Sequence, residues 1–215
     1  KMGEILNLKL LELSNFYPIF RKIFSDSSIM NLSNHSFNLK SPYSFLWAEN
    51  ELSFNQRGYN TSFLNKVSSL EIETYLQNVL LRDADQMGMA NSLEIRVPFL
   101  DHSLVEYVLS LSDKLKYPEY PKKLLVDSTK GWIPDEIINR KKMGFVFPWE
   151  KWMRNELKTF CEQSINSLEH IPFFDMNYVN TLWINFLKNK SQVHWLQIWS
   201  LVVLGKWTSN NRTKK

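Results

Sequence analysis

The stretch from Ile72 to His102 reads IETYLQNVLLRDADQMGMANSLEIRVPFLDH, and it holds a clear helix signal followed directly by a dense group of charges. Apolar residues recur there with the period of one helix face, at Ile72, Tyr75, Leu76, Val79 and Leu80. This spacing predicts an amphipathic α-helix. Ser68 and Glu71 have the spacing of a capping box, which predicts that the helix begins beside them.

Charged residues cluster where this helix ends. Pro98 favours an extended conformation at Val97, so residues 94–98 are expected to form a turn or a short extended piece between helices. Charges at such a corner either interlock or point into a cleft. The structural interpretation is a buried ion pair that fixes the corner, either Glu94 with Arg96 or Asp85 with Arg96.

The helical period continues through much of the chain, with almost no period-2 alternation and no internal repeat. The expected helices run from Ile5 to Leu13, ended by Ser14-Asn15; from Pro18 to Phe24; from the cap Asp101 over buried Leu104, Val105, Val108 and Leu109; from Pro121; from Pro134; from Pro148, long, over Trp152, Met153 and Leu157; from the cap Asp175 over Tyr178, Val179, Leu182, Trp183, Phe186 and Leu187; and from near Ser191. Residues 26–61 are polar and are expected to be irregular. The predicted fold class is mainly α.

Composition narrows the possible partners. The formal charge is only +4, and the basic residues are scattered apart from Arg140-Lys141-Lys142 and residues 212–215. Nucleic-acid-binding domains concentrate such charge, so no nucleic-acid partner is expected. The apolar stretch 193–207 is too short and too polar to span a bilayer, so no membrane partner is expected. The single cysteine, Cys161, excludes an internal disulfide and suits a reducing cytoplasm.

Two basic groups follow the charged corner. The residues Lys122-Lys123-Leu124-Leu125 open an expected helix. The ordinary interpretation of Lys122 is a solvated lysine, although the helix dipole disfavours a cation at a helix N-terminus. Arg140-Lys141-Lys142 has three interpretations. It reaches phosphates, it pairs with Glu94 or Asp101, or it complements a helix C-terminus with Gly144 as the cap or turn glycine.

In residue type, order and spacing, these blocks resemble the signatures of the asparagine synthetase family. The form L-x-x-x-D-R-x-S-M-A-x-x-x-E-x-R-x-P-F-L-D is matched at Asp85, Met89, Ala90, Glu94, Arg96, Pro98, Phe99, Leu100 and Asp101. Lys122 to Leu125 resembles K-x-x-L, with Ile133-Pro134 where the family has L-P. The form R-x-K-x-G-F-x-x-P-x-x-x-W is matched at Arg140, Lys142, Gly144, Phe145, Pro148 and Trp152.

The resemblance implies the helical C-terminal portion of an adenine-nucleotide α-hydrolase-like synthetase domain. In that family, ATP with Mg2+ adenylates the side-chain carboxylate of aspartate. Ammonia, released from glutamine in a separate N-terminal domain, then displaces AMP. Lys122 matches the family's active-site lysine, which implies that it stabilises negative charge near the α-phosphate. The expected cleft-lining residues are Asp85, Glu94, Arg96, Arg140 and Lys142, and no metal ligand is expected.

Two family motifs have no counterpart in the sequence. The six glycines never fall as a pair, so the phosphate-binding loop S-G-G-x-D-S is absent, and so is the acidic motif G-E-G-x-D-E. The chain alone is therefore expected to be inactive and to bind neither ATP nor Mg2+. Its expected partners are an upstream nucleotide-binding segment, an N-terminal glutaminase domain, small-molecule substrates and further copies of itself.

Residues 1–215 are expected to form part of one synthetase domain, with helices and an irregular segment over 1–67 and a helical region with the family motifs over 68–215. Departures from the family pattern at Gln86, Gly88, Asn91 and Val126 leave the acceptor substrate open. One alternative is a related amidotransferase that acts on a sugar or another carboxylate. A second alternative, from a different class, is a non-catalytic helical binding or scaffold module.

Overall fold

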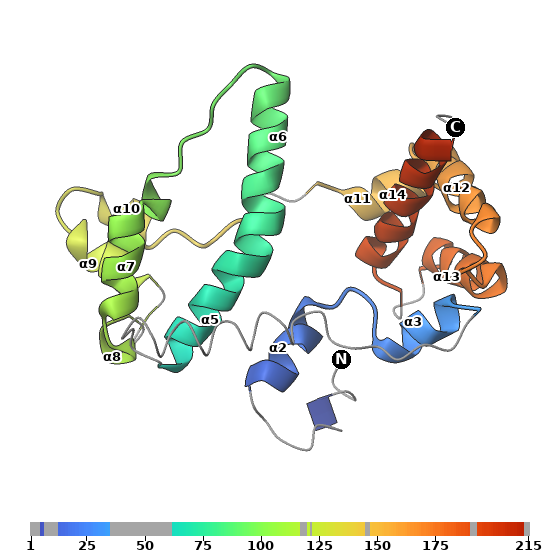
Figure 1. Ribbon diagram of the computed structural model, residues 1–215. Coiled ribbons are helices and arrows are strands. Elements are labelled where there is room, and N and C mark those ends of the chain that lie inside the picture. Colours follow the sequence, from blue (N-terminus) through green and yellow to red (C-terminus); the bar gives the residue numbers. More distant parts are fainter. Residues whose placement is uncertain are drawn as a thin grey trace. The chain divides into compact units, whose positions relative to one another are not determined.

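The computed structural model describes residues 5–6, 13–34, 62–116, 120, 122–144, 147–189 and 193–212. These residues form helices joined by turns, and no strand occurs among them, which confirms the mainly α fold class. The chain divides into two compact units (Figure 1). One comprises Lys1–Ser41 and Met143–Lys215, and the other comprises Pro42–Lys142.

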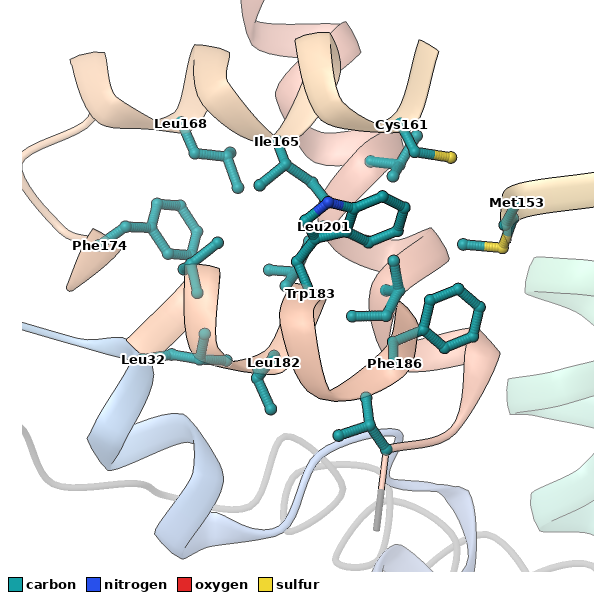
Figure 2. Close-up of a cluster of buried hydrophobic side chains, with 14 residues drawn as sticks. Leu32, Met153, Cys161, Ile165, Leu168, Phe174, Leu182, Trp183, Phe186 and Leu201 are labelled. Carbon is teal, nitrogen blue, oxygen red and sulfur yellow. The ribbon is translucent and has the colours of Figure 1, made fainter. Parts of the chain in front are cut away.

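The unit formed by the two ends of the chain contains a well-packed helical core. Its described helices are α2 (Leu13–Arg21), α3 (Asp26–Leu32), α11 (Trp149–Arg154), α12 (Lys158–Asn166), the 3-10 helix η3 (Ser167–His170), α13 (Met176–Leu187) and α14 (Trp195–Arg212). α14 packs on α12 and α13, and α3 packs on α13. Figure 2 shows the apolar side chains that converge between these helices.

The face predicted for residues 175–187 is confirmed, because Val179, Leu182, Trp183 and Phe186 all lie in this core. Burial raises the pKa of the Cys161 thiol to about 11, so the thiol stays protonated at neutral pH. Cys161 is therefore a packing residue of the core, and the pKa makes it a poor nucleophile.

The middle unit begins with a helical run that is continuous from Phe63 to Ala90 (Figure 1). This run consists of α5 (Phe63–Glu71), the π-helix η1 (Ile72–Leu81) and α6 (Arg82–Ala90). After it come the 3-10 helix η2 (Pro98–Leu100), α7 (His102–Ser110), α8 (Asp113–Lys116), α9 (Lys123–Ser128) and α10 (Asp135–Ile138). α10 follows Pro134 directly, as the position of that proline predicts.

The helix start predicted at Ser68 is wrong, because Ser68 and Glu71 lie inside α5 and the N-cap is Ser62. The α-helical period predicted for 72–80 is also wrong. That stretch is a π-helix, in which hydrogen bonds span i to i+5 and side chains no longer stack at the α-helical spacing. Tyr75, Val79 and Leu80 are 39%, 41% and 47% exposed, so they do not form a buried face within the unit.

The middle unit is held together largely by polar contacts. Asp113 accepts hydrogen bonds from the Ser62 hydroxyl and from the Leu64 N–H, and the Asn65 amide donates to the Leu109 carbonyl at 2.7 Å. Among the described residues of this unit, Leu70 is the only buried hydrophobic one. The burial predicted along α7 is therefore wrong: Leu104 is 39% exposed, because too few apolar side chains pack over that helix.

Several predicted boundaries differ from the structure. Ser14 and Asn15 lie inside α2, which also contains Pro18, the residue where a helix was predicted to start. The helical hydrogen bonds continue after the proline, where the Lys22 N–H donates to the Pro18 carbonyl at 2.9 Å. Residues 26–32, predicted to be irregular, form α3, because the Ser25 hydroxyl caps it by accepting from the Ser28 N–H at 3.1 Å.

The helix predicted from Pro148 is short, because a turn over residues 155–157 separates α11 from α12. The last helix begins at Trp195, four residues after the predicted Ser191. Most of the predicted helix over 5–13, the start at Pro121 and residues 35–61 lie outside the described residues. Among the helices that are described, none is long and apolar enough to cross a membrane.

Both predicted aspartate caps are confirmed. The Asp101 carboxylate accepts from the Ser103 and Leu104 N–H groups, and the Asp175 carboxylate accepts from the Asn177 and Tyr178 N–H groups at 2.9 and 3.2 Å. These contacts satisfy backbone donors that a helix leaves unpaired at its start.

Removing the second cap has a measurable cost. We expect Asp175→Ala to lower the free energy of unfolding by about 1 kcal/mol, because two donors lose their acceptor. Asp175→Asn keeps an acceptor oxygen and is expected to stay close to the parent. Urea denaturation followed by tryptophan fluorescence compares the two variants, and equal losses would mean that the cap contributes only through its charge.

Candidate functional site

The connection after α6 turns sharply and then extends. The Asn91 and Leu93 N–H groups both donate to the Gly88 carbonyl at 2.9 Å, and Ser92 adopts a left-handed conformation with φ of 58°. This closes the helix as a left-handed C-terminal turn. Residues 93–97 follow without helical structure, as predicted, and end at the 3-10 turn that begins with Pro98.

Gly88 allows this connection to return against α6. A Cβ atom placed on Gly88 would lie 2.8 Å from the Leu93 carbonyl oxygen and 3.1 Å from two carbons of the Ile95 side chain. The backbone oxygen cannot move aside as a flexible side chain can. Gly88 departs from the family pattern, which commonly has serine at this position. The close approach of residues 93–95 to α6 therefore requires a residue without a side chain here.

We expect Gly88→Ser to destabilise the middle unit by about 1 to 2 kcal/mol, because the added atoms overpack a backbone contact. Gly88→Ala is expected to have a similar cost, since the clash begins at Cβ. Hydrogen exchange of residues 91–97 together with thermal unfolding measures the effect. An unchanged melting temperature and unchanged exchange would show that the connection does not depend on this glycine.

The predicted ion pair at the corner forms, but it is not buried. The Arg96 guanidinium lies 3.0 Å from the Glu94 carboxylate, and the two side chains are 83% and 70% exposed. The prediction of a buried pair is wrong because no described segment covers the connection. Asp85, on the exposed surface of α6, is not the partner of Arg96. An exposed pair of this kind contributes little to stability.

Lys122 and the neighbouring Lys123 occupy different environments. Lys122 is exposed, stands at the N-cap of α9 with a left-handed φ of 62°, and has no ion-pair partner among the described residues. Lys123 lies 3.3 Å from the Asp127 carboxylate and 5.1 Å from the centre of the Tyr120 ring, and its side chain is only 25% exposed. Lys123 is therefore packed and paired.

Tyr120 and Asp127 complete this arrangement and were not predicted as site residues. The Tyr120 hydroxyl donates to the Asp127 carboxylate at 2.6 Å, and this hydrogen bond, with the nearby lysines, lowers the pKa of that carboxyl. The i, i+4 spacing of Lys123 and Asp127 is visible in the sequence and predicts their ion pair. The pairing of Lys123 leaves Lys122 as the lysine of this block that is open to an incoming anion.

Arg140 and Lys142 lie in the non-helical residues that follow α10. Both are exposed, and neither makes an ion pair within the described part of the chain. The predicted pairing of this basic group with Glu94 or Asp101 is therefore not observed. Gly144 does not cap a helix either, because α10 ends at Ile138 with Asn139 as its C-cap. The two cations are available to a phosphate or carboxylate.

The described residues do not provide a site for a divalent metal ion. Within the described ranges, no group of three His, Cys, Asp or Glu side chains is placed to hold a metal ion. The sequence also lacks a glycine-rich phosphate loop. The described residues of the three motif blocks offer exposed cations and the Glu94–Arg96 pair. Such groups can neutralise and orient an anionic ligand that another segment holds, but they cannot organise a metal–nucleotide complex alone.

Comparison with known proteins places the chain in a family. Residues 11–209 match the family described as asparagine synthase, so the chain belongs to the asparagine synthase family. It is 32% identical over 155 residues to asparagine synthetase [glutamine-hydrolyzing] 1 of Bacillus subtilis, covering 72% of this chain and 24% of that protein. It is 30% identical over 124 residues to amidase chyE of Penicillium rubens, covering 53% of this chain and 18% of that protein.

A putative asparagine synthetase [glutamine-hydrolyzing] of Mycobacterium tuberculosis is 26% identical over 144 residues, covering 66% of this chain and 22% of that protein. The chain thus spans about a quarter or less of the length of these relatives. No solved structure matches it.

Proposed function

We propose that the protein carrying this chain is a glutamine-dependent ligase that converts aspartate to asparagine, and that the chain is the helical C-terminal part of its synthetase domain. The observation that carries the proposal is the family match over residues 11–209, within which the three motif blocks occur in the family's order. The relative in Bacillus subtilis, named as an asparagine synthetase, supports it.

In the proposed reaction, an oxygen of the aspartate side-chain carboxylate attacks the α-phosphorus of ATP and pyrophosphate leaves. Ammonia then attacks the acyl carbon, and AMP leaves with that oxygen. The chain's part is electrostatic. Lys122 neutralises charge that develops at the α-phosphate, and Arg140 and Lys142 hold phosphate oxygens. Glu94 and Arg96 shape the cleft wall, with Asp85 beside them on α6.

The remaining parts of the site lie in other segments of the proposed enzyme. An upstream nucleotide-binding segment supplies the phosphate loop and the ligands of Mg2+, and an N-terminal glutaminase domain supplies ammonia. We place the enzyme in the cytoplasm, which a single buried, protonated cysteine suits.

A coupled assay tests this proposal. The full-length protein with ATP, aspartate and glutamine is expected to release pyrophosphate and to form AMP, asparagine and glutamate in equal amounts. The 215-residue chain alone is the matched control and is expected to release no pyrophosphate, because it lacks the phosphate loop. Turnover by the isolated chain, or none by the full-length protein, would overturn the proposal.

A second candidate is an amide-forming enzyme with another acceptor. The residues at Gln86, Gly88 and Asn91 depart from the family pattern, and a relative is named as an amidase. The same assay, run with a panel of amino acids, amino sugars and other carboxylates in place of aspartate, separates the two. Pyrophosphate release that depends on a compound other than aspartate would select the second candidate.

A further inference from the structure

Residues 93–97 form a non-helical connection, in which the side chains of Glu94, Ile95 and Arg96 alternate between two faces. Glu94 and Arg96 lie on one face, where their ion pair joins positions i and i+2. Ile95 lies on the opposite face, since its side chain would be 3.1 Å from a Cβ atom on Gly88. Side chains that alternate in this way are typical of an extended strand. Within the described part of the chain, this extended segment, called the 93–97 strand, pairs with no other segment.

Its backbone is open to pairing. The Leu93 N–H donates to Gly88, and the Val97 carbonyl accepts from Leu100, each at 2.9 Å. Between these two bonds, no N–H group from Glu94 to Val97 donates to another described residue. Leu93, Ile95 and Val97 are also 63%, 52% and 43% exposed. An unpaired strand edge with exposed apolar side chains is a template for a second strand.

We propose that this strand pairs in antiparallel fashion with the same strand of a second copy of the chain, with Ile95 on the twofold axis. In that register Glu94 faces Arg96 of the partner subunit, and Leu93 faces Val97 of the partner subunit. The sequence LEIRV is therefore complementary to itself in both charge and apolar contacts. A twofold axis repeats each pair, so each favourable contact occurs twice.

The pairing goes beyond the proposed ligase function and does not depend on it. It also has a consequence for that function, because Glu94 and Arg96 are the proposed cleft wall. Two chains paired through this strand would each have that wall covered by the partner. Glu94 and Arg96 would thus serve self-association in one state and line the cleft in the other.

Charge reversal tests the register directly in the 215-residue chain. Glu94→Arg places arginine opposite the partner's Arg96, and Arg96→Glu places glutamate opposite the partner's Glu94. Each variant alone is expected to dimerise about tenfold more weakly than the parent, or worse, because two attractive pairs become repulsive. An equimolar mixture of the two variants, and the double variant Glu94→Arg/Arg96→Glu, are each expected to restore association.

Sedimentation velocity over a concentration series measures these dissociation constants. Far-ultraviolet circular dichroism checks folding, which both exposed positions should tolerate. A parent chain that stays monomeric throughout would overturn the proposal. So would single variants that associate as tightly as the parent, or a mixture that associates no better than its components. None of these measurements involves catalysis, so such a result would leave the proposed ligase function untouched.

Discussion

Lys122→Ala in the full-length enzyme is expected to slow adenylate formation by about a hundredfold or more, because a positioned cation that acts on developing phosphate charge contributes several kcal/mol. Lys122 is exposed and has no ion-pair partner among the described residues, so its charge is free to meet a ligand. The loss should appear mainly in kcat, with a modest change in the KM for aspartate, because the contact strengthens in the transition state. Pyrophosphate release under steady-state conditions measures it.

Two other lysines serve as comparisons. Lys123 already contacts Asp127 and Tyr120, so Lys123→Ala is expected to retain near-parental activity and to lose only the small stability of a partly exposed i, i+4 ion pair. Lys142→Ala is expected to be intermediate, since Lys142 is proposed to hold phosphate oxygens. Equal activities of the Lys122 and Lys123 variants would contradict the assignment. A larger loss at Lys142 than at Lys122 would indicate that Lys142, and not Lys122, contacts the α-phosphate.

Gly205→Ala is expected to destabilise the helical core of the unit formed by the two ends of the chain by about 3 kcal/mol or more. Gly205 is buried in α14, and a Cβ atom there would overlap the backbone carbonyl of Ser164 on α12. The Ser167 hydroxyl also donates to the Gly205 carbonyl at 2.8 Å, which fixes the approach of the two helices. Alanine alone would favour a helix by about 1 kcal/mol, so the loss must come from the overlap.

Gly131→Ala is the matched control. Gly131 has a left-handed φ of 83° and no atom within 4 Å of an added Cβ, so alanine there meets backbone strain without a clash. We expect a cost of about 1 kcal/mol. Guanidinium denaturation followed by circular dichroism compares the two variants. A Gly205 variant as stable as the Gly131 variant would show that α12 and α14 separate easily.

The features that the sequence predicted well depend on local interactions. Asp101 and Asp175 cap their helices through N–H groups two and three residues away, so the sequence contains everything that the contact needs. The apolar face of α13 is similarly local, because its spacing matches a regular α-helix. The start of α5 was missed because Ser62 precedes the helix without making a side-chain cap hydrogen bond.

The π-helix and the exposure of the site could not be predicted in the same way. A stretch such as 72–81 has apolar residues that fit an α-helical period, and only the hydrogen-bond pattern along the whole run from Phe63 to Ala90 selects the wider helix. The identity of the Glu94–Arg96 pair follows from their close spacing. Its exposure depends on which segments cover the connection, and spacing carries no information about that.

Transfer of a heavy-oxygen label from aspartate to AMP is the most direct test of the proposed ligase. The full-length protein is incubated with aspartate labelled in its side-chain carboxylate, with ATP and with glutamine, and the products are analysed by mass spectrometry. Because the attacking carboxylate oxygen leaves with AMP, we expect one labelled oxygen in AMP and none in pyrophosphate. Unlabelled AMP, or ADP formed together with labelled inorganic phosphate, would contradict adenylation of aspartate by this enzyme.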